Sequence, residues 1–133
     1  QKKIEGVIND FAREPKIHGI LVQLPLPKRL DEERILNTIP LGKDVDGFHP
    51  ENIGRLAQKG RRPLFTPCTP SGIIYLLKKY TNTLEGKRAV ILGRSNIVGM
   101  PVSLLLLREN ATITICHSRT KDLPLIAKDR SGV

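Results

Sequence analysis

The tripeptide Gly93–Ser95 could hold a phosphate. It directly follows the apolar run Ala89–Leu92 and precedes a second apolar run, an order typical of a strand, a turn and a helix. Glycine permits the sharp turn, and a helix that follows would direct backbone N–H groups and a partial positive charge at the same place. Ser95 adds a hydroxyl donor. The dinucleotide fingerprint Gly-x-Gly-x-x-Gly is broken, because Ser95 replaces the middle glycine and Gly99 lies one place late, so a purely structural turn stays an equal alternative.

The residues after the next predicted strand favour NADP over NAD. In NAD-binding folds, an acidic residue about 20 positions after the glycines binds the ribose 2′-hydroxyl. Here residues 113–120 contain no Asp or Glu and instead carry His117, Ser118 and Arg119. Together with Arg94, this set can accommodate a 2′-phosphate. For both arginines, a solvated surface charge is the alternative.

Further polar groups lie in the first half of the chain. Gln23 ends a predicted buried strand, and the prolines after it favour a positioned amide over a merely structural one. Asp44 and Asp46 lie two positions apart in a loop, so in extended chain only one can face a given site. That carboxylate could accept hydrogen bonds from a heterocycle with N–H and NH₂ donors, whereas Asp44 is expected to form an Asx-turn.

Two other chemistries are not predicted. His49 lies close to the two aspartates, but no set of His, Cys and Asp has the spacing of a metal site. Cys68 could be a nucleophile at a helix start, yet no base is near it in the sequence, so we expect a buried structural thiol.

The elements that must position these residues follow from hydrophobic spacing. In the second half, strands separated by single helices imply parallel pairing, so the predicted fold class is α/β. Asp31 and Thr69 are predicted N-caps, with Pro70 at the first helical position. The pattern predicts helices over residues 1–13, 31–39, 51–57, 70–80, 101–108 and 121–128, and strands over 19–24, 87–92 and 111–116.

Composition narrows the function classes. The chain has 133 residues and a net charge of +9, which favours anionic partners, but aromatic residues make up only 4%, so stacking on nucleic acid is not predicted. No apolar run reaches the roughly 20 residues of a membrane span. Two cysteines are too few for a disulfide-stapled secreted domain, which favours the cytoplasm. Because the chain opens on Gln1 with a helix and ends at Val133 just after one, we expect a piece of a longer protein.

Four segments together resemble one family. GILVQLPLP, KDVDGFHPENIGRL, PCTPSGII and GRSNIVGMP, in this order, resemble the bifunctional methylenetetrahydrofolate dehydrogenase/methenyltetrahydrofolate cyclohydrolase family over residues 1–121, while the tail Asp129–Val133 matches nothing recognised. The resemblance implies two lobes with a cleft between them, both incomplete here. Residues 1–67 would belong to an α/β folate-binding catalytic domain, and residues 68–133 to a Rossmann-like, parallel-sheet NADP-binding domain.

The resemblance also implies a reaction and its residues. NADP would oxidise 5,10-methylenetetrahydrofolate to the methenyl form, which water would then open to 10-formyltetrahydrofolate. Position by position, the family's motifs assign the active-site glutamine to Gln23 within the substrate segment Val22, Gln23 and Leu24, the pterin-binding aspartate to Asp46, the phosphate turn to Gly93, Arg94 and Ser95, and a further NADP contact to Ser118.

One departure from the family limits the expected activity. The family's catalytic lysine lies in a Tyr-x-x-x-Lys helix upstream of the residues present here, and the pair Tyr75 and Lys79 matches a different element. We therefore expect the 133-residue chain alone to be inactive. The alternatives are a binding or regulatory domain of the same fold without catalysis, and another NADP-dependent dehydrogenase. The family resemblance further implies a homodimer.

Overall fold

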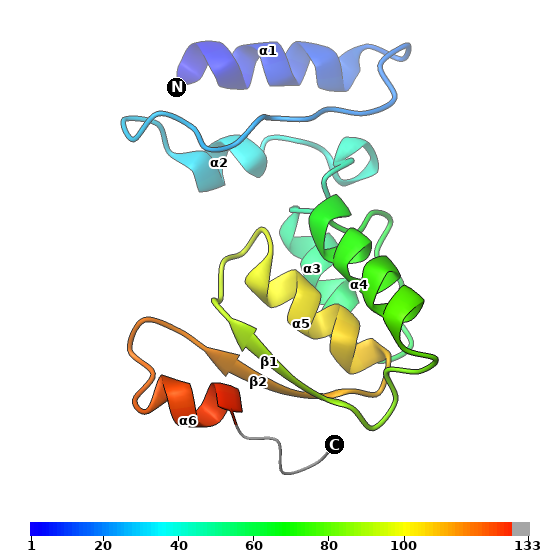
Figure 1. Ribbon diagram of the computed structural model, residues 1–133. Helices are drawn as coiled ribbons and strands as arrows, with labels where there is room; N and C mark the ends of the chain where they lie inside the picture. Colours follow the sequence, from blue (N-terminus) through cyan, green and yellow to red (C-terminus); the bar gives the residue numbers. More distant parts are fainter. Residues whose placement is uncertain (129–133) are drawn as a thin grey trace. The chain divides into compact units, whose positions relative to one another are not determined.

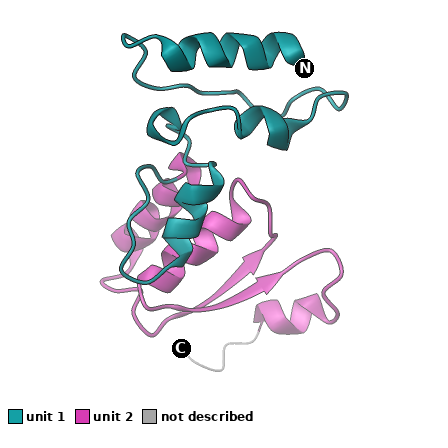
Figure 2. Cartoon of the chain, turned by 180° about the vertical axis from the view of Figure 1, so that it is seen from behind, with its two compact units in different colours: residues 1–66 teal, residues 67–133 magenta. Residues whose placement is uncertain are grey.

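A computed structural model describes residues 1–128 of the chain; the tail Asp129–Val133 lies outside the described residues. The chain divides into two compact units, Gln1–Thr66 and Pro67–Val133 (Figure 2). Helices combine with a parallel two-stranded sheet, so the α/β prediction is confirmed. None of the described helices is both long and apolar enough to cross a bilayer.

The first unit consists of short helices and ordered loops. The predicted N-cap of the second helix is confirmed, because Asp31 Oδ1 accepts a hydrogen bond from the Arg34 N–H at 2.9 Å. That helix ends earlier than predicted, since Thr38 and Ile39 continue in tighter i→i+3 bonds before Pro40. The elements are α1 (Lys2–Arg13), α2 (Glu32–Leu36), the 3₁₀ turn η1 (Leu41–Lys43) and α3 (Pro50–Ala57).

The core of the first unit is aliphatic and small. Helix α1 turns one apolar stripe inward, and Ile8 on that stripe is buried. Partly buried residues from α1, α2 and the segment between them surround this core. Its buried members are Ile8, Ile20, Ile35 and Ile39.

The predicted strand over residues 19–24 does not form. Ile20 makes a single parallel bridge with Asp44, in which its N–H donates to the Lys43 carbonyl at 2.8 Å. A strand requires a neighbour that pairs along several residues, and in the described part of this unit only Lys43 and Asp44 pair with the segment. The apolar run of this segment therefore correctly predicted partial burial, but it did not predict correctly that the segment pairs as a β-strand.

The second unit has the predicted α-β-α-β-α order. Strand β1 (Arg88–Leu92) pairs in parallel with β2 (Thr112–Cys116), with Leu92 opposite Cys116. Figures 1 and 2 show α5 on one side of this sheet and α6 on the other. All boundaries lie within two residues of those predicted. The helices are α4 (Cys68–Tyr80), α5 (Gly99–Arg108) and α6 (Leu123–Lys128).

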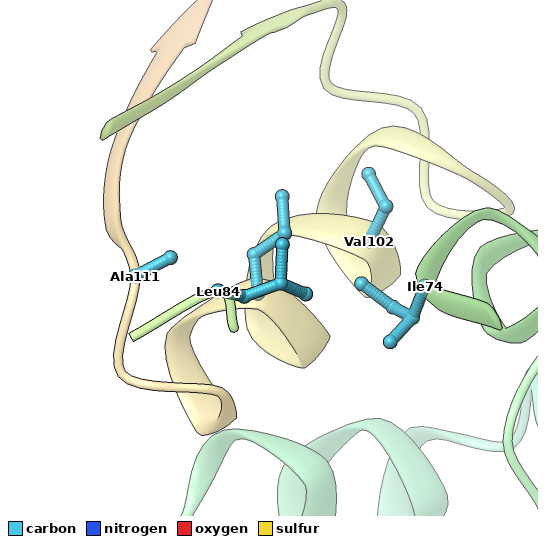
Figure 3. Close-up of a cluster of buried hydrophobic side chains, with 5 residues drawn as sticks. Ile74, Leu84, Val102 and Ala111 are labelled. Atoms are coloured by element: carbon cyan, nitrogen blue, oxygen red, sulfur yellow. The ribbon is translucent and has the colours of Figure 1, made fainter. Parts of the chain in front are cut away.

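A second apolar core holds this unit together. Figure 3 shows Ile74 of α4 and Val102 of α5 beside Leu84 and Ala111, which precede the two strands. Leu106 completes the buried cluster. Because α5 contributes to this core directly after the Gly93–Ser95 turn, packing of the helix fixes where the turn lies.

The start of α4 differs from the prediction in two ways. The helix begins at Cys68 with Pro67 as N-cap, so Thr69 is not the cap, and Pro70 is accepted within the first turn, where backbone N–H groups have no intrahelical partner. Cys68 is exposed rather than buried, because the first turn directs it to the surface; Cys116 at the end of β2 is the buried thiol. Both are free thiols.

Candidate functional site

The phosphate-type turn lies where the two parallel strands end. Directly after the last pair, Leu92 and Cys116, the Gly93 N–H donates to the Cys116 carbonyl at 2.8 Å. Gly93 has φ +127°, a conformation that residues with a Cβ rarely adopt. The turn therefore needs glycine here, as the sequence indicated.

Ser95 lies in the turn, three residues before Val98, the N-cap residue of α5, and caps the start of that helix from there. Its Oγ accepts hydrogen bonds from the N–H groups of Val98 at 3.2 Å and Gly99 at 3.1 Å, and its carbonyl accepts from Met100 at 2.9 Å. The pattern predicted that N–H groups at the helix start would point at a phosphate, but those of Gly99 and Met100 are already bonded to Ser95. Its hydroxyl hydrogen remains available to donate outward.

Gly99 permits a close approach of α5 to the turn. A Cβ at this position would lie 2.6 Å from the Gly93 carbonyl oxygen and 2.9 Å from the Arg94 Cα. The tight contact is with the turn itself, and it fixes the turn against the helix start.

A hollow of about 250 Å³ opens beside the strand ends. Two of the predicted cofactor residues, Gly93 and Ser118, line it, whereas the exposed Arg94 and Ser95 do not. The Arg119 N–H donates to His117 Nδ1 at 3.2 Å, so the chain turns in an ordered way after β2. The lining residues are Leu92, Gly93, Cys116, His117, Ser118 and Leu123.

The predicted substrate segment lies on the surface of the first unit. Gln23 is exposed, and its Nε2 donates to the Leu24 carbonyl at 2.9 Å. Val22 and Leu24 are half-buried, and Val22 packs against the core of the unit. The Gln23 amide therefore faces solvent, while the neighbouring Val22 side chain packs on the core and holds the segment in place.

The two aspartates have different environments. Asp44 is 2% exposed and accepts three hydrogen bonds, from the backbone N–H groups of Phe48 and His49 and from the Asn52 side chain. Asp44 is therefore structural, as expected, but its backbone bonds run to N–H groups four and five residues on rather than two, so it does not form the predicted Asx-turn. Asp46 is half-buried, and its partial burial, followed by the nearby charge of Asp44, raises the pKa of its carboxyl above the usual range.

The predicted residues fall into two groups. Ile20 and Asp44, which precede Gln23 and Asp46 by three and two residues, form a β-bridge, so the two segments lie side by side at that point. Both residues belong to the first unit, whereas Gly93, Arg94, Ser95 and Ser118 belong to the second.

Sequence reasoning missed two polar residues that hold the Asp46 loop. Lys43 Nζ donates to the carbonyls of Phe11, Ala12 and Glu14 at 2.8 to 3.0 Å and so closes the end of α1. Asn52, buried in α3, bonds to Asp44. The sequence offered two weak signals for these roles: Lys43 precedes a predicted Asx-turn, and Asn52 lies inside a short predicted helix. Neither signal reveals the distant residue to which the side chain bonds.

Two models of one protein family match separate parts of the chain. Residues 67–131 match the family model "Tetrahydrofolate dehydrogenase/cyclohydrolase, NAD(P)-binding domain", and residues 1–46 match the catalytic domain of the same name. The match to the NAD(P)-binding domain ends at residue 131. It therefore includes residues 129–131 of the tail, which we had expected to match no known family.

Individual relatives agree with these matches. The chain is 60% identical over 129 residues to the bifunctional protein FolD 4, chloroplastic, of Arabidopsis thaliana, covering 97% of this chain and 36% of that protein. It is 56% identical to the bifunctional protein FolD of Listeria innocua, covering 97% and 45%. The chain thus spans less than half the length of these relatives.

Solved structures show the same likeness. The FolD enzyme of Campylobacter jejuni superposes with a TM-score of 0.85 at 49% identity, covering 94% of this chain and 44% of that one. The Trypanosoma brucei enzyme, complexed with NADP cofactor and inhibitor, gives a TM-score of 0.84 at 40% identity, covering 90% and 40%.

Proposed function

The chain belongs to the tetrahydrofolate dehydrogenase/cyclohydrolase family, and we propose its function on that basis. It supplies the folate-binding loop around Asp46 and the NADP-binding turn Gly93–Ser95 of an enzyme. This enzyme oxidises 5,10-methylenetetrahydrofolate with NADP and hydrolyses the methenyl product to 10-formyltetrahydrofolate. The observation that carries this proposal is the glycine turn at the carboxyl ends of two parallel strands, the place where such folds bind nucleotides.

The second unit offers a fit for NADP. Gly93 has no side chain to obstruct a phosphate, Ser95 keeps one hydroxyl hydrogen to donate, and Arg94 is exposed beside it. Ser118 lies on the hollow at the end of the neighbouring strand. NADP, when bound, supplies the acceptor of the hydride. These four residues would hold and orient it.

The first unit offers a fit for the pteridine. The Asp46 carboxylate can accept hydrogen bonds from ring N–H and NH₂ donors, and its partial desolvation strengthens such bonds. Gln23 presents an amide on the adjacent segment, flanked by Val22 and Leu24. We assign binding of the substrate to all four residues, and direct participation at the reacting ring to Gln23 and Asp46.

The domain, assembly and location proposals follow the family. Residues 1–67 form part of the folate-binding domain and residues 68–133 part of the NADP-binding domain, in a homodimer that analytical ultracentrifugation of the native protein would detect. We propose a cytoplasmic location. Because two relatives are named chloroplastic, immunolocalisation should compare the cytoplasm with plastids.

A competing function is ligand binding without turnover. Within residues 1–128, the one Tyr-x-x-x-Lys spacing is Tyr75 and Lys79 on α4 of the second unit, where the ammonium lies 5.1 Å from the ring centroid. The family's catalytic lysine is therefore not supplied by this pair, and the 133-residue chain alone should bind without catalysing.

Calorimetric titration of the 133-residue chain tests both proposals. We expect NADP to bind more tightly than NAD, and Arg94→Ala to remove most of that preference. Equal affinities would refute the NADP assignment. A dehydrogenase assay of the same chain should show no turnover, and robust turnover would show that catalysis needs no further segment.

A further inference from the structure

The loop that carries Asp46 is organised around one buried carboxylate. Asp44 Oδ1 accepts from the Phe48 N–H at 3.2 Å, and Oδ2 accepts from the His49 N–H at 2.9 Å. The Gly47 N–H also donates to the Asp44 carbonyl at 3.1 Å. The backbone therefore curls around this side chain, and Asp46 lies between the two attached ends.

Asn52 completes the hydrogen bonding of that carboxylate. It is 1% exposed, and its Nδ2 donates to Asp44 Oδ2 at 2.8 Å. Its Oδ1 accepts from the N–H groups of Leu64 at 2.9 Å and Phe65 at 3.4 Å. A primary amide of this length can donate on one side and accept on the other, which neither aspartate nor leucine of similar size can do.

We propose that Asn52 is a positioning residue for Asp46 and acts through the Asp44 carboxylate. This inference rests on the proposed function, because binding of the pteridine gives the fixed position of Asp46 its purpose. Asn52 does not touch the substrate in this scheme. It holds the carboxylate around which residues 44–49 fold, and it ties that loop to the backbone at Leu64 and Phe65.

A merely structural role for Asn52 predicts something different. If the asparagine only attaches residues 64–65 to α3, its removal should lower stability and leave the environment of Asp46 unchanged. If it positions Asp46, its removal should also let water reach the Asp46 carboxyl and loosen the bonds from Phe48 and His49.

Carbon-detected NMR of the 133-residue chain separates these roles. The carboxyl signal of Asp46 is assigned by its loss in Asp46→Asn and is followed over pH, together with amide exchange of Phe48 and His49. In Asn52→Ala we expect the Asp46 midpoint to fall toward the ordinary aspartate value and the two amides to exchange roughly threefold to tenfold faster, as the loss of about one hydrogen bond allows. The matched control Asn37→Ala, an exposed asparagine of the same unit, should change neither.

Unchanged midpoint and exchange in a folded Asn52→Ala chain would overturn the proposal. Should that variant not fold, the wild-type chain still decides, because the side-chain NH₂ signals of Asn52 should shift at the Asp46 midpoint, and their failure to do so would equally overturn it. The proposed function is tested separately, by binding of tetrahydrofolate to wild type and Asp46→Asn. Equal affinities there would reject the role of Asp46 in substrate binding without affecting the titration result.

Discussion

The two units build their candidate sites in different ways. In the second unit, the site follows from regular elements: two parallel strands end together, a glycine turn follows, and α5 is packed against that turn. In the first unit, the candidate residues lie on irregular chain that polar side chains hold in place, chiefly Lys43, Asp44 and Asn52. The first kind of site depends on backbone geometry and the second on individual side-chain hydrogen bonds.

The largest expected effect tests the backbone-built site. Gly99→Ala would place a Cβ 2.6 Å from the Gly93 carbonyl oxygen, which belongs to the backbone and cannot rotate away. We expect a loss of about 2–3 kcal/mol in the free energy of unfolding, as for other overpacked positions, together with weaker NADP binding. Urea denaturation measures the first effect and calorimetry the second.

Gly72→Ala on α4 is the matched control. No atom outside the local chain lies within 4 Å of a Cβ built there, and the position is exposed and helical. Alanine should raise stability by about 0.5–1 kcal/mol because of its helix propensity. If Gly99→Ala and Gly72→Ala lower the free energy of unfolding by similar amounts, the tight contact at Gly99 is not what fixes the turn.

The next prediction tests the site held by side chains. Lys43→Met keeps most of the side-chain stem but removes the ammonium that serves three carbonyls at the end of α1. We expect a loss of about 1–2 kcal/mol, measured by urea denaturation, because charge-assisted bonds and the favourable charge at a helix C-terminus are lost together. Lys28→Met, at an exposed position, should change stability by less than about 0.5 kcal/mol. A loss no larger for Lys43 than for Lys28 would contradict the capping role.

Two serines of the second unit distinguish capping from ligand binding. Ser95→Ala removes the acceptor of the N–H groups of Val98, the N-cap of α5, and Gly99, its first residue, so we expect a loss of about 1 kcal/mol in stability as well as weaker NADP binding. Ser118→Ala, at an exposed position on the hollow, should weaken NADP binding and leave the unfolding free energy nearly unchanged. If both variants unfold like wild type, Ser95 does not cap α5 in solution.

This contrast also explains what could be predicted from the sequence. The strands, helices and parallel pairing of the second unit follow from hydrophobic spacing and from glycines at fixed points, which are local signals. The bonds of Asn52 in α3 to Asp44, Leu64 and Phe65 reach residues 8 to 13 positions away in irregular chain, where no periodicity marks these partners. The strand predicted over residues 19–24 failed for the same reason, because pairing depends on a neighbour that the segment's own sequence does not reveal.

The smallest expected effect concerns the charge of Asp46. Partial burial and the Asp44 charge raise the pKa of the Asp46 carboxyl in the folded chain, so between the ordinary aspartate pKa of about 3.9 and the raised value the folded state binds more protons than the unfolded state. The contribution of Asp46 to stability therefore falls as the pH rises through this window, and it is unfavourable at neutral pH. Asp46→Asn should raise the free energy of unfolding at pH 7 by about 0.5 kcal/mol or less, since the side chain keeps contact with water, and the difference should vanish below the ordinary pKa. Urea denaturation of both chains from pH 3 to pH 7 measures this. A variant that is less stable than wild type at pH 7 would mean that the Asp46 carboxylate stabilises its loop, as Asp44 does, and the distinction between a structural and a ligand-binding aspartate would be lost.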